Sequence, residues 1–551
     1  MRRTYHVARA DFLQRVRSRR LLVVLAVVAY LGYLVNVGQI ELAYQLTEGE
    51  SLTNVHGVNT AAFVGLKAGM TGSMVMLFAG FYLMKGTVAR DRLHDVDRVT
   101  ASTTISDRSY LAGKWLSNLG LGVAVLLALG FATVANHLVH GVGPTKPLAL
   151  VGPIVVLALP LAALVGAVAL LFESVGRLDG TLGNVGYFFL ATFTLAGIVS
   201  AEGRLPSELP VAVRAADIMG HLTVYVLTAE ALLDVAPEAG GVLPSFGTLA
   251  GDQLAFRYDG RAWPAWIYVQ RAALVVPAVA VLLAAAIPFE RGRSTEASSN
   301  GAGRWSRVVG LLPTPGGESE SSTTPDDPET VDSASLTRVE DRNASGFGRL
   351  VSAELRLAVR GRRWWWYAGA LALVVAPVGL LASGGSPSLA SELARGLLLP
   401  LAFVWPIFVW SELGTRVVRH RMTDLVLSSN YPVRQLVAEW VGGVVVALAV
   451  SSGLVALFVG TGQTSALVGV AAGAVFAPSL AVAAGIWSRS SWLFELSYLM
   501  LWYVGPLNGG VPVDFLGTTG ESLDAGVPLV FAGLGLALVG AAVVRRKQDV
   551  K

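Results

Sequence analysis

Few residues of this 551-residue chain have the type and spacing that catalysis or metal binding requires. His137 and His140 lie three positions apart, but the neighbouring sequence offers no third ligand for a metal. The segment Ala112–Trp115 contains a Gly-Lys pair, but it lacks the upstream glycine and the hydroxyl residue that complete a phosphate-binding loop. The chain has no cysteine, which excludes thiol chemistry. We therefore expect no catalytic residue, no metal site and no cofactor bound by this chain itself.

Charged residues within or at the ends of long apolar runs are the remaining candidates for function. A charge in hydrocarbon is costly, so such residues usually face protein, water or a partner. The simplest interpretation is that their long side chains reach towards the membrane surface. Arg271, about a turn and a half into its apolar run, is the strongest candidate for a role of its own. The others are Lys67, Glu173, Glu392, Arg395 and Glu412.

The composition is that of a membrane protein. Hydrophobic residues make up 53% of the chain and charged residues 15%, and the mean hydropathy is +0.58. The apolar residues come in runs of roughly 17 to 25, which is the length of a helix that crosses a bilayer. The sequence therefore predicts an all-α membrane protein of about twelve transmembrane helices. We place them at 21–37, 61–84, 116–139, 148–172, 181–200, 265–289, 364–383, 389–411, 440–460, 465–487, 492–508 and 525–544.

The distribution of basic residues predicts the topology. With the amino terminus inside, 34 of the 42 Lys and Arg residues fall in inner segments, five in outer segments and three within spans. Basic residues collect on the cytoplasmic side, so we expect both termini to be cytoplasmic. The first apolar run is followed by no small-residue cleavage site, and we interpret it as a retained anchor. The protein is then a multi-pass protein of the cell (plasma or inner) membrane.

The sequence indicates two six-helix halves, residues 1–290 and 346–551, joined by a linker at 291–345. The linker is rich in Ser, Thr, Pro and acidic residues, which predicts a disordered acidic cytoplasmic segment. Ala10-Asp11-Phe12 recurs as Ala353-Glu354-Leu355, and Lys114-Trp115 as Glu439-Trp440. Because six is even, the halves form parallel repeats.

The outer segments differ between the halves. The long outer loop of the first half, 201–264, has a counterpart of only about seventeen residues at 508–524 in the second half. Within the long loop, apolar and polar residues alternate with helical spacing between positions 217 and 234. This pattern predicts a helix in the outer membrane interface.

A basic amphipathic segment precedes the first span of each half, at Tyr5–Arg20 and Phe347–Arg363. In the first, Tyr5, Ala8, Phe12 and Val16 follow a helical spacing opposite basic residues. One interpretation is a positive flank that only fixes topology; the other is an elbow helix that lies on anionic headgroups. The candidate elbow-helix residues are Arg9, Asp11, Arg15, Arg17, Glu354, Arg356 and Arg360.

A charged loop follows the second span of each half, at 86–115 and 416–440. Each has the pattern of a short charged helix, a polar turn and a new helix that re-enters the membrane. Such loops either dock on a partner or are solvated segments that fix topology. The candidate docking residues are Arg90, Asp91, Arg92, Asp95, Arg98, Arg108, Lys114, Arg416, Arg419, Arg421, Asp424, Arg434 and Glu439.

Taken together, these features resemble the permease of an ABC-2 type transporter. Permeases of that family have six spans per half, an elbow helix, a cytoplasmic coupling helix between the second and third spans, and an outer helix between the fifth and sixth. The stretch Ile105–Lys114 is similar to the family pattern, whereas the second half has Glu439 where the first has Lys114. The resemblance implies an exporter, with both loops docked on ABC-type ATPase subunits, two copies in all, that bind and hydrolyse ATP. It implies membrane lipid as a further partner and no nucleic acid.

Two other classes of function remain open. A secondary carrier of the major facilitator type, coupled to ions or protons, also has twelve spans in two parallel halves. Residues 86–92 weakly match its loop motif, but Arg90 stands where the motif has Asp. A membrane-embedded enzyme or an envelope scaffold is the other class, and no catalytic motif supports the enzyme. The apolar interior suits a lipidic or amphipathic passenger better than a small ion.

Overall fold

The chain forms two compact helical units, Met1–Val308 and Val309–Lys551, and each is considered by itself. The division between the units falls inside the predicted linker 291–345, which lies outside the described residues. The computed structural model describes residues 2–37, 41–48, 51–199, 213–214, 216–235, 237, 241–247, 253–289, 346–360, 362–382, 391–420, 422–429 and 431–550.

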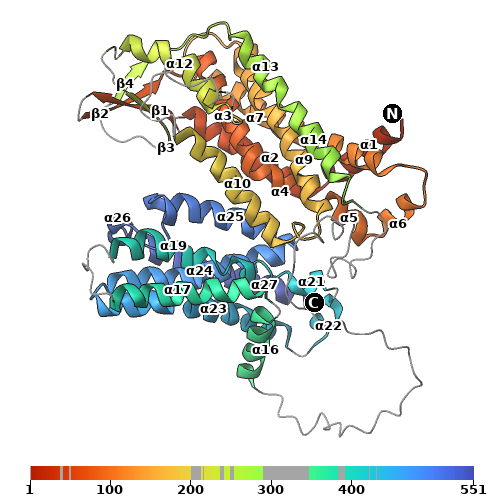
Figure 1. The fold of residues 1–551 in the computed structure, drawn as a ribbon, viewed down its shortest axis with the longest axis vertical. Coiled ribbons are helices and arrows are strands. Elements are labelled where there is room, and N and C mark those ends of the chain that lie inside the picture. The colour runs from red at the N-terminus through yellow and green to blue at the C-terminus, as the bar shows by residue number, and fades with distance from the viewer. Residues whose placement is uncertain are drawn as a thin grey trace, which may run out of the picture. The chain divides into compact units, whose positions relative to one another are not determined.

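The first unit is a bundle of long helices with short helices at one end. Thr60 and Ser106 accept the backbone N–H of the residue three positions on, and so begin the long helices α3 and α7. Helices α1, α5 and α6 lie at one end of this bundle, and α12 lies at the other (Figure 1). The helices are α1 (Arg2–Val16), α2 (Arg19–Val37), α3 (Ala61–Val75), α4 (Phe81–Met84), α5 (Thr87–Leu93), α6 (Val96–Ala101), α7 (Asp107–His140), α8 (Pro147–Pro153), α9 (Leu159–Ser174), α10 (Thr181–Val199), α12 (His221–Val235), α13 (Ala265–Ala273) and α14 (Val275–Ala285), with π-helical segments η1 (Met76–Gly80) and η2 (Ile154–Ala158).

A small sheet at the α12 end was not predicted from the sequence. Its strands are β1 (Glu41–Glu48), β2 (Ser51–Gly57), β3 (Gly241–Gly247) and β4 (Gln253–Phe256), in the order β3-β1-β2-β4. β1 pairs antiparallel with β2 and β3, with Tyr44 opposite Val55 and Pro244, and β2 pairs parallel with β4. The sheet therefore joins two segments that are far apart in sequence.

Helix α12 confirms the helix predicted near 217–234, and most of its residues are buried within the unit. Its residues Leu222, Tyr225 and Leu227 form a core with Tyr44 of the sheet and Phe63 of α3. Burying these apolar side chains against the sheet stabilises the α12 end of the first unit.

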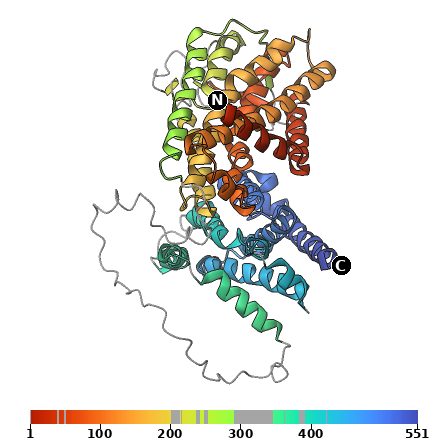
Figure 2. The same ribbon diagram turned by 90° about the vertical axis from the view of Figure 1, so that its right-hand side faces the viewer.

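The second unit is a further bundle. Helix α16 packs against α23, and the two lie side by side in Figure 2. Helix α26 lies at the opposite end of this bundle from α21 and α22 (Figure 1). The elements are α16 (Phe347–Val359), α17 (Trp364–Ala382), η5 (Ala394–Leu398), α19 (Leu399–Val404), α20 (Ile407–Trp410), α21 (Arg416–Arg419), α22 (Thr423–Leu427), α23 (Pro432–Gly460), α24 (Ser465–Ser488), α25 (Trp492–Trp502), η6 (Tyr503–Leu507), η7 (Val511–Val513), α26 (Gly520–Asp524) and α27 (Val527–Val550).

Nine helical stretches in the described part of the chain are long and apolar enough to cross a membrane. A tenth is counted if α1 and α2, bent by 75°, are one broken span. The remaining predicted spans coincide with α2, α10, and α25 followed by η6. The protein is thus a helical, multi-pass membrane protein, and the count of twelve stays a prediction. The nine are Ala61–Arg92, Asp107–His140, Pro147–Ser174, Ala265–Ala285, Trp364–Ala382, Ser391–Trp410, Pro432–Gly460, Ser465–Ser488 and Val527–Asp549.

Single cysteines in this thiol-free chain test the predicted topology. Thr103 lies in the exposed turn before α7, and Asp259 is exposed beyond β4. In intact cells, we expect an impermeant maleimide to label Asp259→Cys and to label Thr103→Cys only after the membrane is permeabilised. Labelling of Thr103→Cys in intact cells would contradict a cytoplasmic α5–α7 loop.

Candidate functional site

A buried ion network ties the short helices of the first unit to its bundle. Lys114 of α7 lies 2.8 Å from Asp11 of α1 and 2.7 Å from Asp91 of α5, and its side chain is 3% exposed. Ser117 donates a hydrogen bond of 2.5 Å to the other oxygen of Asp11, and Tyr110 donates one of 2.6 Å to Asp91. One ammonium therefore links three segments that are separate in sequence, and each carboxylate has a further hydrogen-bond donor.

Arg15 adds a second attachment for α1. Its guanidinium donates to the side chain of Asn118 on α7 (2.8 Å) and to the carbonyl of Met84 at the end of α4 (3.1 Å). It also lies 3.3 Å from Asp11, one turn earlier on α1. Burial lowers the pKa of Arg15 to about 10, and Asp11 opposes that shift, so the guanidinium stays charged at neutral pH.

The environment of Asp11 favours its ionised form. Burial by itself would raise the pKa of Asp11, but the charges of Arg15 and Lys114 and the bonds from Lys114 and Ser117 bring it below the usual 3.8. Because the folded-state pKa is lowered, the stability that Asp11 contributes is present above about pH 3.8 and is lost as the pH falls through the lower value.

Glu173, at the end of α9, caps the start of α5. Gly86, with φ of +88°, turns the chain out of α4 in a conformation that favours glycine. The backbone N–H groups of Gly86 and Val88 each donate to a different oxygen of Glu173 at 2.7 Å, and that of Thr87 donates at 3.2 Å. The carboxylate of Glu173 is thus buried, and it holds the first turn of α5.

A pocket of about 490 Å³ lies over this network, between α1, α5, α6 and α7. Its lining includes the network residues Asp11, Asp91 and Lys114, together with Arg90. The polar remainder of its lining is Arg3, His6, Gln14, His94, Thr100 and Tyr110. The pocket floor is therefore fixed by buried ion pairs, and its rim carries side chains that a protein partner could contact.

The second unit also has an ion network, at the loop 416–440. In this network an arginine, and not a lysine, joins two carboxylates. Arg416 of α21 lies 2.9 Å from Glu354 of α16 and 3.6 Å from Glu412, and Glu412 also pairs with Arg362 at 2.8 Å. Gln435 donates to Glu354 at 2.9 Å. The two inner-end glutamates Glu173 and Glu412 are thus both engaged by protein groups rather than by solvent alone.

In the second unit, as in the first, a buried glutamate accepts the backbone N–H of a glycine with positive φ. Here the pair is Glu439 and Gly414. Gly414 has φ of +72°, and its N–H donates to the buried carboxylate of Glu439 at 2.9 Å. A side chain at Gly414 would also meet the carbonyl oxygen of Val482 at 2.6 Å. In the first unit the capping acid is on α9, whereas here it is on α23, at the position that the sequence aligns with Lys114.

The structure brings some of the candidate docking and elbow-helix residues together and leaves others apart. Asp11, Arg90, Asp91 and Lys114 meet at one pocket. Arg92 lies 4.0 Å from Asp179 in a half-buried contact. Asp95 and Arg98 form an exposed pair at 3.5 Å. The exposed remainder is Arg9, Arg17, Arg108, Arg356, Arg360, Arg419, Asp424 and Arg434, and Arg421 lies outside the described residues.

The first elbow helix directs charged residues towards α7. Arg15, a candidate for headgroup contact, is only 5% exposed, whereas Tyr5 is 60% exposed within the unit. Asp11 and Arg15 contact α7, because buried charges need partners inside the protein. The elbow helix of the second unit also buries its acid, Glu354.

Several residues of the network were missed by sequence reasoning. Tyr110, Ser117, Asn118 and Gln435 are polar residues on long helices. Ser117 and Asn118 follow Lys114 within about one helical turn, so three polar residues share one face of an otherwise apolar run. This clustering of polar residues was the sequence signal that could have indicated the network.

Arg271 has a partner at the sheet end of the first unit. Its guanidinium lies 3.0 Å from Asp217 and donates to the carbonyl oxygens of Asp217 (2.7 Å) and Ile218 (2.8 Å). Asp217 also accepts the backbone N–H groups of His221 and Thr223 at the start of α12. The pair therefore fastens α12 to α13, which is a structural role.

Lys67 is a further deeply buried cation. It donates to the side chain of Asn59, just before α3, at 2.7 Å and to the carbonyl of Val35 at 3.1 Å. Its ammonium is thus held by protein groups near the first turn of α3.

The ion network at the α1 end attaches the short charged helices α1 and α5 rigidly to the helix bundle. The pocket above the network has a polar rim. In the residues that the structure describes, no three His, Asp or Glu side chains gather as a metal site. When compared with models of protein families and with curated proteins, the sequence shows no match.

Proposed function

We propose that this chain is the membrane-spanning permease subunit of an ATP-driven ABC-2 type exporter. ATP is bound and hydrolysed by separate ATPase subunits, two copies in all, docked on the cytoplasmic loops of the two halves. The permease has twelve spans in two parallel halves, with both termini in the cytoplasm, and lies in the cell membrane.

The observation that carries this proposal is the attachment of α5 to the bundle. Two buried anchors hold this short loop helix: Asp91 pairs with Lys114, and Glu173 accepts the backbone N–H groups at the first turn of α5. A loop that only fixed topology would need positive charge and no such anchors. A coupling helix must transmit the movement of an ATPase subunit to the transmembrane helices. It must therefore be joined firmly to them, because coupling needs a contiguous packed network.

The positions of the buried carboxylates favour this proposal over an ion-coupled carrier. Carriers place their coupling groups near the middle of the membrane. Glu495, buried in the predicted span 492–508, lies in the first turn of α25. Glu173 and Glu439, which are buried in two of the nine candidate spans, also lie near helix ends and accept backbone N–H groups. Their roles in the described structure are those of helix and turn caps.

The proposal is tested by finding which polypeptide binds ATP. We expect photolabelling with azido-ATP, in membranes that contain the native complex, to mark a separate co-purifying polypeptide and to leave this chain unmarked, because the chain has no phosphate-binding loop. The purified chain alone should not hydrolyse ATP. A label on the chain itself, or a transport-competent preparation with no labelled polypeptide, would contradict the proposal.

A further inference from the structure

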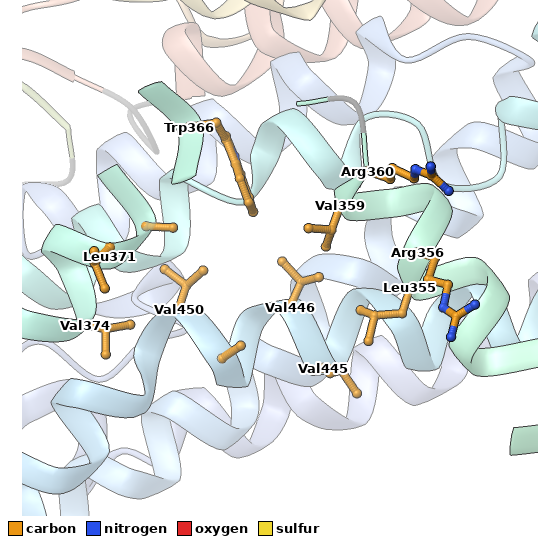
Figure 3. A pocket seen from close by; sticks show the side chains of 12 residues that line it. Leu355, Arg356, Val359, Arg360, Trp366, Leu371, Val374, Val445, Val446 and Val450 are labelled. Carbon is orange, nitrogen blue, oxygen red and sulfur yellow. The ribbon is translucent and has the colours of Figure 1, made fainter. Parts of the chain in front are cut away.

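An apolar groove lies within the second unit between α16, α17 and α23 (Figure 3). Its volume is about 610 Å³, within the range of about 300–1,000 Å³ that is common for small-molecule sites. Its walls are aliphatic apart from one indole. The lining includes Leu355, Val359, Trp366, Leu371, Val374 and Val446.

Two arginines lie at one end of this groove. Arg356 of α16 and Arg360, the residue after this helix, line the groove and are exposed. Figure 3 shows both at the end away from Leu371 and Val374. The one acidic residue in the sequence of α16, Glu354, is held by Arg416 and Gln435. Glu354 therefore pairs with residues outside the groove. The groove has a cationic end, formed by the two arginines, and its other walls are apolar.

The groove extends along helices that cross the membrane. Both α17 and α23 are candidate spans, and α17 is exposed along much of its length within its unit, with Trp364 80% and Leu371 63% exposed. The amphipathic helix α16 comes immediately before α17 in the chain. Its arginines are therefore placed at headgroup level, while the apolar walls reach into the hydrocarbon.

We propose that this groove binds one anionic glycerophospholipid. One acyl chain lies along α17 and α23, and the phosphate contacts Arg356 and Arg360. In a bilayer the acyl chain gains little from apolar walls, because its alternative surroundings are also hydrocarbon. Retention and selectivity therefore come from the two guanidinium groups, whose planar donors match phosphate oxygens. This inference does not depend on the proposed transport function.

The test is native mass spectrometry of the full-length chain in detergent, titrated with phosphatidylglycerol or with phosphatidylcholine of the same acyl chains. We expect one phosphatidylglycerol to be retained in preference to phosphatidylcholine by roughly tenfold, since each basic residue near the surface contributes to anionic-lipid binding. The variant Arg356→Gln/Arg360→Gln should lose that preference. Ala449→Trp, at an exposed position in the groove lining, should reduce retention of both lipids.

The matched control is Arg349→Gln/Arg363→Gln, which removes the same charge at exposed positions that do not line the groove. This control should keep the lipid preference. If both double variants lost the preference for phosphatidylglycerol equally, the preference would come from general charge attraction. If glycerol phosphate fully displaced phosphatidylglycerol, the arginines would form a simple anion site. If the wild-type chain retained no phosphatidylglycerol, protein rather than lipid would cover the groove. Each of these three results would overturn the proposal.

Discussion

Replacing Lys114 with Met is expected to destabilise the first unit by about 3–5 kcal/mol, the usual cost of removing one partner from a buried ion pair. Methionine keeps most of the apolar stem but removes the cation, so Asp11 and Asp91 lose the charge that bridges them. We expect a lower thermal unfolding temperature in detergent and faster hydrogen exchange of the backbone amides in α1 and α5.

The exposed pair Arg98–Asp95 supplies the control, because its side chains are 63% and 62% exposed. Arg98→Gln should change stability by less than about 1 kcal/mol, as is usual for surface pairs. Combining Lys114→Met with Asp91→Asn should recover part of the loss, since it removes one of the two stranded charges. Equal, small effects of Lys114→Met and Arg98→Gln would contradict a buried network.

A loss of similar size, about 3–5 kcal/mol, is expected for Arg271→Met at the sheet end of the first unit. The variant leaves the buried carboxylate of Asp217 without its cation, although the carboxylate still accepts the N–H groups of α12. Hydrogen exchange should rise at the start of α12 and remain unchanged in α1 and α5. Arg257→Gln is the control, because Arg257 pairs with Asp259 on the surface. Protection of α12 equal to that of the wild type would show that Arg271 does not hold this helix.

The helical spans could be predicted because the bilayer fixes their length and their hydropathy. Nine predicted spans coincide with helical stretches that are long and apolar enough to cross a membrane. The sheet could not be predicted in this way. Its strand β1 pairs with β3, where Glu41 lies opposite Gly247. Local patterns of polarity carry no information about a partner so distant in sequence.

The site shows a different limit of sequence reasoning. The spacing of Tyr5 and Val16 predicted a helix with an apolar face, but it did not predict which residues of that helix contact the rest of the protein. In a bilayer, apolar side chains are equally stable against lipid, whereas charged groups such as Asp11 and Arg15 must find partners inside the protein. The recurrence of an acid at Asp11 and Glu354, in otherwise basic helices, was the more informative signal. Lys114 was selected from the sequence as a candidate docking residue, and its partners inside the protein could be identified only from the fold.

The most direct test of ATPase docking is a triple charge reversal on the α5–α7 loop. Arg90, Arg98 and Arg108 are changed to Glu, and Arg92 is left intact because it contacts Asp179. Single surface pairs contribute only about 0.2–1 kcal/mol, so three reversals are needed for a clear effect. The control reverses Arg177, Arg489 and Lys547, which are exposed basic residues outside this loop.

The measurement is the amount of ATPase subunit that co-purifies with the permease, together with its substrate-stimulated hydrolysis, at equal permease abundance. The proposed function predicts that both quantities fall in the triple variant and are unchanged in the control. A triple variant that is normally inserted and still recruits a fully stimulated ATPase would contradict docking at this loop.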